Sequence, residues 1–123
     1  MPIDSSAWIE LYEGSEAGRA VKAALMQNAC YTSMVTVAEV TSAAMRKSKD
    51  SMALVEVIGG SSSLLGIDPA IASLAGRLNF ERKRSNRKWG MTDSFILEAG
   101  MIYGLKILTE DRDFGDLPNV VLV

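Results

Sequence analysis

Short apolar segments of the type found in β-strands alternate with longer segments of helical pattern, and this alternation most restricts the fold. Parallel strands need crossover connections, which are usually helical. We therefore expect an α/β protein with a mostly parallel sheet of about five strands sandwiched by helices. The expected strands are 1–3, 30–33, 62–67, 105–109 and 119–123. The expected helices are 4–12, 15–27, 34–49, 50–58, 68–84 and 92–104.

Several helix boundaries have local signals. Asp68 followed by Pro69 is a strong helix start, since Asp can cap the free N–H groups and Pro suits the first helical position. Gly59 and Gly60 are expected to end the preceding helix, and the stretch "IGGSSS" is expected to be a loop. Gly104 is expected to close the late helix.

The size and composition predict one domain over residues 1–123. The chain has 123 residues, 48% of them hydrophobic, which is enough for a buried core. The longest uncharged run, 23–38, is 16 residues long and contains several polar side chains, so it is too short and too polar to span a bilayer. The first basic residue is Arg19, which is unlike a secretory signal, and we expect a cytoplasmic protein.

The chain has no histidine and a single cysteine, Cys30. A Ser-His-Asp triad, a His general base and an ordinary His-containing zinc site are therefore excluded. Cys30 lies in an apolar-leaning stretch and is expected to be a small core residue. Any hydrolytic chemistry must rely on carboxylates, hydroxyls, Lys or Arg side chains, or a metal.

Four acidic residues lie where the expected strands end or the adjoining helices begin: Asp4, Glu39, Asp93 and Asp111. In an open parallel sheet, ligands bind beyond the carboxyl ends of the strands, so all four can reach one edge. Two carboxylates ~5 Å apart repel by roughly 3 kcal/mol at an effective dielectric of about 20. A divalent cation offsets that repulsion, and oxygen ligands without His or Cys favour Mg²⁺ or Mn²⁺.

Each acid also has a purely structural interpretation. Asp4 and Asp93 suit helix capping. Asp111, Asp113 and Asp116 suit a turn that contains Gly and Pro. Glu39 suits a solvated helix position, although its neighbours in "VAEV" are apolar.

Read in order, "IDSSAW", "TVAEV", "TDSFILEAG" and "ILTEDRDF" resemble the PIN-domain family, including the VapC-like toxin ribonucleases. The stretch "LLGIDPAIASLAGRL" is similar to the helix start after the family's third strand. The resemblance covers nearly the whole chain. It implies a three-layer α/β/α sandwich with a five-stranded sheet in the order 3-2-1-4-5. Only three residues precede Asp4, so the first strand is expected to be very short.

The resemblance also implies a site and an activity. Asp4, Glu39, Asp93 and Asp111 would be the catalytic acids that hold Mg²⁺ or Mn²⁺, and Asp113 would be a fifth, acting through water. Ser6 and Thr109 match hydroxyl positions near the family's site. The implied activity is metal-dependent hydrolysis of RNA to 5′-phosphate and 3′-hydroxyl products. A toxin role, an antitoxin partner and a homodimer are likewise implied.

Residues 77–90 hold six basic residues and one acidic residue in a chain whose net charge is −2. An acidic pocket repels RNA, so this segment is the candidate for receiving the backbone. On a helix, Arg77, Arg84 and Lys88 would share a stripe, and Arg87 lies beside them. The alternative is a solvated helix end and loop. Trp89 would either pack inside or stack on a base.

Two other functional classes stay open. The first is a phospho-accepting receiver with Asp68 as acceptor, although capping alone would explain that residue. The second is a PIN-like RNA-binding or assembly subunit without catalysis. The intact acidic residues argue against the second class but do not remove it.

Overall fold

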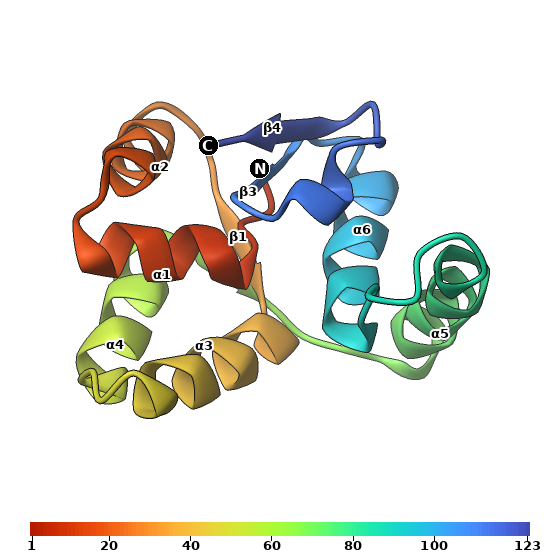
Figure 1. The fold of residues 1–123 in the computed structure, drawn as a ribbon, viewed down its shortest axis with the longest axis horizontal. Helices are drawn as coiled ribbons and strands as arrows, with labels where there is room; N and C mark the ends of the chain where they lie inside the picture. Colours follow the sequence, from red (N-terminus) through yellow and green to blue (C-terminus); the bar gives the residue numbers. More distant parts are fainter.

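The computed structural model describes residues 1–123 and contains six α-helices, four short strands and one 3₁₀ turn (Figure 1). The helices are α1 Ser5–Glu13, α2 Glu16–Gln27, α3 Met34–Arg46, α4 Ser51–Ser61, α5 Pro69–Lys83 and α6 Met91–Tyr103. The strands are β1 Tyr31–Ser33, β2 Ser63–Leu65, β3 Ile107–Thr109 and β4 Val120–Leu122, and the 3₁₀ turn is η1 Arg112–Phe114.

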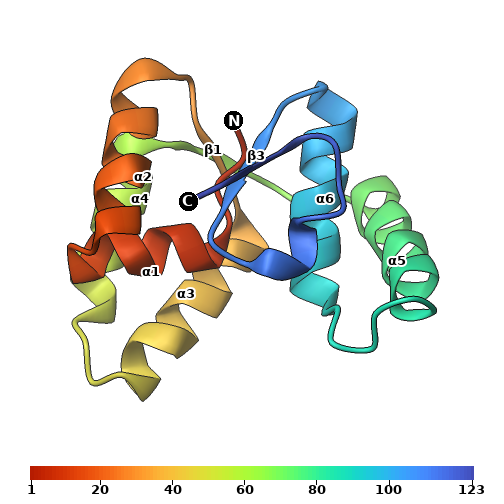
Figure 2. The ribbon, with the colours of Figure 1, turned by 45° about the horizontal axis from the view of Figure 1, so that its top comes forward.

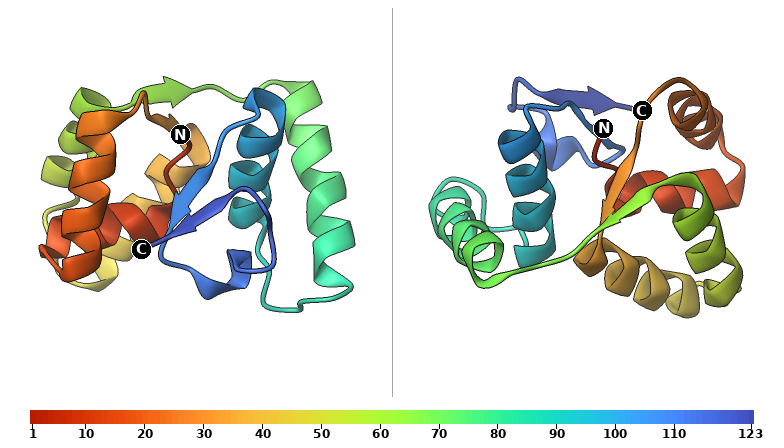
Figure 3. Two further views of the ribbon diagram at one scale, coloured as in Figure 1. Left: turned by 90° about the horizontal axis from the view of Figure 1, so that it is seen from above. Right: turned by 180° about the vertical axis from the view of Figure 1, so that it is seen from behind.

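The strands form two parallel pairs, β1 with β2 and β3 with β4 (Figure 3). Tyr31 lies opposite Ser63 in the first pair, and Ile107 lies opposite Val120 in the second. The parallel arrangement is as expected, but a continuous five-stranded sheet is not formed. Instead, the N-terminal segment lies between the pairs and makes one parallel bridge from Pro2 to Tyr31 and one from Ile3 to Leu108 (Figure 2).

Two local features keep this segment from forming a full strand. Pro2 has no backbone N–H to donate to a neighbouring strand. The extended backbone ends at Asp4, because α1 begins at Ser5. The segment still accounts for its polar groups: Ile3 N–H donates to the Tyr31 carbonyl and Asp4 N–H to the Leu108 carbonyl, each at 2.9 Å.

Helices cover both sides of these strands. α1, α2 and α4 lie on one side, α5 and α6 lie on the other, and α3 contacts both α1 and α6 (Figure 1). The larger core cluster includes Ile3, Trp8 and Leu108, while the smaller one includes Trp89 and Phe114. Cys30 is buried in the larger cluster, as expected. No helix combines the length and apolar character needed to cross a membrane.

Some helix ends follow their local signals and one does not. Asp68 caps α5 by accepting a hydrogen bond from the Ile71 N–H at 2.8 Å. Gly104 ends α6 with φ +61°, a conformation that favours glycine. The expected stop at Gly59 and Gly60 is wrong, because α4 continues through both to Ser61. Burial of the α4 residues Leu54 and Ile58 in the core outweighs the low helix propensity of the glycines.

Candidate functional site

Asp4 is the most buried of the acids, at 3% exposure, and stands at the end of the extended N-terminal segment. Its Oδ2 accepts hydrogen bonds from the Ser6 and Thr109 hydroxyls, each at 2.8 Å. Burial raises its pKa, and these two bonds partly oppose that rise. Although Asp4 occupies the N-cap position of α1, its side chain makes no capping bond. The capping interpretation is therefore wrong for Asp4.

Glu39 projects from α3 and joins the starts of two other helices. One carboxylate oxygen accepts a hydrogen bond from the Ser5 hydroxyl at the start of α1, and the other accepts one from the Thr92 hydroxyl near the start of α6. Glu39 is thus not a solvated helix position. Ser5 and Thr92 are not among the site residues predicted from the sequence. The only signal for them is that each adjoins a candidate acid, in "DSS" and "TDS".

Asp93 is the third residue of α6, where it makes a capping hydrogen bond and has a raised pKa. Its Oδ2 accepts the Gly90 N–H at 2.8 Å, so Asp93 does cap α6, but from the third helical position rather than from the N-cap position, which Gly90 occupies. Burial raises its pKa to about 6, the Gly90 bond opposes the rise, and the charges of Asp4, Asp111 and Glu39 add to it. Asp93 therefore senses all three of the other candidate acids.

Asp111 follows β3 and starts η1, as the turn interpretation expects. Its Oδ1 accepts the Asp113 N–H at 2.9 Å, and its own N–H donates to the Thr109 hydroxyl at 3.0 Å. Thr109 consequently connects Asp111 to Asp4, since its hydroxyl also donates to Asp4. Asp113 is joined to Asp111 by this backbone N–H contact, and the charge of its side chain acts on Arg82.

The structure therefore brings Asp4, Glu39, Asp93 and Asp111 into one electrostatic cluster, which we call the acidic cluster. No Lys or Arg makes an ion pair with any of them, because the two ion pairs in the chain are Lys47–Glu13 and Arg82–Asp116. Asp4 is buried and the other three acids are half-buried, so like charges gathered here without a cation are costly.

The acidic cluster fits a divalent cation in its donor chemistry. All its donors are oxygens, which Mg²⁺ and Mn²⁺ prefer, and Asp93 Oδ1 and Asp111 Oδ2 accept no hydrogen bond. In the described arrangement, no three acidic or Cys side chains are close enough to share one ion. Binding would therefore need the carboxylates to draw together.

The basic segment 77–90 differs from expectation in two ways. α5 ends at Lys83, so Arg84, Arg87 and Lys88 do not lie on that helix with Arg77, and the expected stripe is wrong. Trp89 is fully buried against Phe114, with ring centroids 4.8 Å apart, so base stacking by Trp89 is wrong and inward packing is confirmed. The four basic residues proposed for RNA contact, Arg77, Arg84, Arg87 and Lys88, are all exposed.

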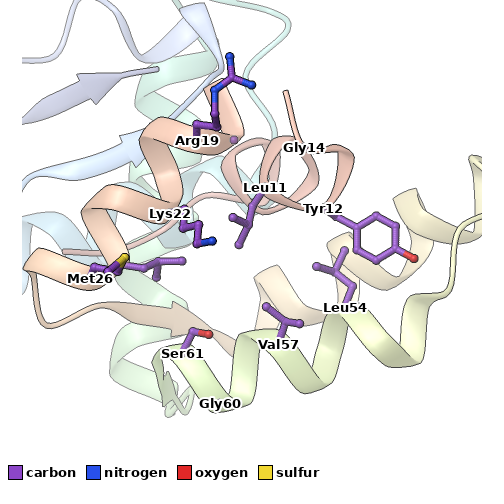
Figure 4. Close-up of a pocket in the computed structure, with 12 residues that line it drawn as sticks. Leu11, Tyr12, Gly14, Arg19, Lys22, Met26, Leu54, Val57, Gly60 and Ser61 are labelled. Atoms are coloured by element: carbon purple, nitrogen blue, oxygen red, sulfur yellow. The ribbon is translucent and has the colours of Figure 1, made fainter. Parts of the chain in front are cut away.

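A groove of about 850 Å³ lies between α1, α2 and α4, away from the acidic cluster (Figure 4). Its apolar lining includes Leu11, Leu54 and Val57, and two basic residues, Arg19 and Lys22, also line it. Met26 at its edge is 79% exposed. The groove therefore offers an apolar surface beside positive charge, a combination that suits an apolar segment carrying acidic residues.

Comparisons with known proteins agree with this architecture. The sequence model of the family described as PIN domain matches residues 1–120. A toxin–antitoxin complex from Klebsiella pneumoniae superposes with a TM-score of 0.71 and 25% identity over 98% of this chain and 94% of that one. VapC20 from Mycobacterium tuberculosis, described as a toxin that cleaves the sarcin–ricin loop, superposes with a TM-score of 0.77 and 15% identity over 99% of this chain and 97% of that one. DNA-bound VapBC from Salmonella typhimurium superposes with a TM-score of 0.71 and 21% identity over 99% of this chain and 95% of that one. A comparison with curated protein sequences finds no match to this chain.

Proposed function

The chain belongs to the PIN-domain family, and we propose that it is a Mg²⁺- or Mn²⁺-dependent endoribonuclease that serves as the toxin of a type II toxin–antitoxin pair. The observation that carries this proposal is the acidic cluster: four carboxylates from separate segments act on one another with no basic side chain paired to them. The similarity to solved toxin structures supports the toxin role.

Asp4, Glu39, Asp93 and Asp111 are proposed to hold the metal, with Asp113 joining them through a water molecule. When bound, the metal would generate hydroxide from water and stabilise charge on the oxygens of the scissile phosphate. Ser6 and Thr109 keep Asp4 oriented through their hydrogen bonds to its Oδ2. Ser5 and Thr92 similarly hold both oxygens of Glu39.

The finer architecture is also proposed. The single bridges of Pro2 and Ile3 support the neighbour order β2, β1, N-terminal segment, β3, β4, which corresponds to the implied order 3-2-1-4-5 with the N-terminal segment as a minimal central strand. Such an order puts Asp4 at the point where the strand order reverses, which is where ligands bind in open sheets. We also propose a homodimer. Light scattering during size-exclusion chromatography tests this proposal, because the measured mass is that of either one chain or two.

Arg77, Arg84, Arg87 and Lys88 are proposed to receive the RNA backbone. Their exposure leaves them accessible to phosphates, and each phosphate contact adds to the salt dependence of binding. We expect Arg84→Ala with Lys88→Ala to weaken binding of a non-cleavable RNA and to lower the slope of log K against log salt by about 2. Unchanged affinity at low salt would remove this segment from the RNA surface.

The groove between α1, α2 and α4 is proposed to take an amphipathic segment of the cognate antitoxin. Its apolar lining and its two basic residues suit a segment with one apolar face and acidic flanks. Met26→Asp with Val57→Asp should abolish antitoxin capture, since both residues line the groove and are exposed. Met45→Asp is the matched control, because Met45 is 66% exposed outside the groove. Equal capture by both variants would refute this location.

An RNA cleavage assay tests the activity. Wild type with Mn²⁺ should cut RNA, chelation by EDTA should stop it, and Asp4→Asn should lower the rate by at least about 100-fold. Asp50→Asn is the control, because Asp50 caps α4, is not one of the acids of the acidic cluster, and can be replaced by Asn, which caps equally well. Cleavage that persists in Asp4→Asn would indicate a contaminating nuclease. RNA binding without any cleavage would favour the alternative, a non-catalytic RNA-binding or assembly subunit.

A further inference from the structure

We propose that Arg82 is a positioning residue, which fixes Asp111 relative to Asp93 and thereby sets the spacing of the acidic cluster. The inference rests on the proposed function for its catalytic meaning. Arg82 belongs to the basic segment 77–90, yet its contacts separate it from the other basic residues there. Arg82 contacts two other segments of the protein, whereas the neighbouring basic residues are exposed to solvent.

The first set of contacts ties Arg82 to the segment that carries Asp111. Nη1 and Nη2 donate to the two carboxylate oxygens of Asp116 at 2.8 and 2.9 Å, and Nη2 also donates to the Asp113 carbonyl at 3.2 Å. A bidentate Arg–carboxylate pair fixes orientation as well as distance. Arg82 on α5 therefore holds η1 and the turn after it, which begin at Asp111.

The second set of contacts ties Arg82 to the segment that leads into Asp93. Its guanidinium carbon lies 4.3 Å from the centre of the Trp89 ring, at stacking distance. The Trp89 indole N–H donates to the Ser94 hydroxyl at 2.8 Å, next to Asp93 in α6. Trp89 also packs on Phe114 of η1. One side chain thus contacts both segments that supply late acids to the cluster.

The burial of Arg82 argues against a direct role in RNA contact. Its side chain is 15% exposed, whereas Arg77, Arg84, Arg87 and Lys88 are all exposed. Its Nε is buried and has no hydrogen-bond partner. Nη1 and Nη2 already donate to Asp116 and to the Asp113 carbonyl, so Arg82 has fewer free donors for a phosphate than the exposed basic residues have.

The test measures Mn²⁺ affinity by calorimetry for wild type, Arg82→Gln, Asp116→Asn and the double variant. Residues that orient metal ligands typically change affinity by about 10- to 100-fold, so we expect a loss of about 10-fold for Arg82→Gln. Asp116→Asn should show a smaller loss, and the double variant should be no weaker than Arg82→Gln, because both changes break one interaction. Arg82→Lys should restore only part of the affinity, since Lys cannot make the bidentate pair.

Asp116→Asn protects the test against simple misfolding, because the Asp116 side chain is 66% exposed and its replacement leaves the core intact. Arg46→Gln is the charge-matched control, since Arg46 is exposed at the end of α3, and its Mn²⁺ affinity should equal that of wild type. If wild type binds Mn²⁺ and both Arg82→Gln and Asp116→Asn bind it with unchanged affinity, the positioning role of Arg82 is overturned while the proposed function stands.

Amide hydrogen exchange in EDTA supplies a second readout that needs no metal. The Asp113 N–H, which donates to Asp111, should exchange faster in Arg82→Gln and Asp116→Asn than in wild type and Arg46→Gln. Equal exchange in all four proteins would overturn the positioning role. A wild type that binds no Mn²⁺ even with a non-cleavable RNA present would instead overturn the proposed metal centre, and the exchange result would still decide whether Arg82 holds η1.

Discussion

Replacing Asp93 by Asn should stabilise the metal-free protein at neutral and alkaline pH. Asp93 has its pKa raised to about 6, first by burial and then by the charges of Asp4, Asp111 and Glu39. A carboxyl group whose pKa is higher in the folded state than in the unfolded chain costs stability once it ionises. Asn removes that charge and keeps an oxygen that can accept the Gly90 N–H.

The magnitude follows from the two pKa values. Between the ordinary value of 3.8 and about 6, a difference of one pH unit is worth about 1.4 kcal/mol, which gives an upper figure of about 3 kcal/mol. Asp93 is only partly buried, so solvent screens part of this energy. We therefore expect Asp93→Asn to raise the free energy of unfolding by about 1–2 kcal/mol at pH 8.

The pH dependence carries the sign of the effect. Well below pH 3.8, Asp93 is protonated in both the folded and unfolded states, so the variant has no advantage there, and at pH 4 its advantage is still small. The advantage should grow between about pH 4 and 6 and stay constant above that range. Urea denaturation at pH 4 and pH 8, in EDTA, measures both ends of the window.

Two results would refute the reasoning behind the Asp93 prediction. The first is an Asp93→Asn variant that is less stable than wild type at pH 8. The second is a gain that is equal at pH 4 and pH 8, since it could not come from ionisation. Asp50→Asn provides the control, because Asp50 is exposed and its capping bond to Ala53 is one that Asn can also make.

Three further predictions concern other parts of the chain. Glu98→Gln should raise stability at pH 8 and leave it unchanged near pH 4, because Glu98 is 4% exposed, forms no ion pair, and has its pKa raised first by burial and then by the charge of Asp68; an equal gain at both pH values would contradict this cause. Gly18→Ala should destabilise by about 3 kcal/mol or more, since its Cβ would lie 2.1 Å from the Glu10 carbonyl oxygen, whereas Gly76→Ala, which meets nothing within 4 Å, should stabilise by about 0.5–1 kcal/mol in thermal unfolding. Thr92→Val should slow RNA cleavage at constant stability by freeing one oxygen of Glu39, and an unchanged rate would show that this contact is dispensable.

The sequence supported the fold wherever a local signal and the tertiary structure agree. Asp68 with Pro69 starts α5, and Gly104 ends α6, as their types predict. The four acids could be identified because each lies at a strand end or near a helix start, and parallel pairing brings such positions to one edge. Asp93 caps α6 and also belongs to the acidic cluster, so its capping contact does not remove it from the candidate metal ligands.

The sequence could not show features that depend on packing between distant segments. Gly59 and Gly60 remain helical because core burial of α4 outweighs their propensity. The end of α5 at Lys83 removed the expected stripe, and the burial of Trp89 decided between inward packing and base stacking in favour of packing. Arg82 has no distinguishing local signal, because its role depends on Asp116, which lies 34 residues further along the chain.

Calorimetric titration of Mn²⁺ into the wild type and the Asp4→Asn/Asp93→Asn double variant tests the central claim most directly, since it requires no knowledge of the RNA target. The metal-centre account predicts saturable binding by the wild type and its loss in the double variant, which lacks two of the four charges in the acidic cluster. Equal binding by both proteins, or no binding by the wild type at millimolar Mn²⁺ even with a non-cleavable RNA present, would contradict the proposed metal centre.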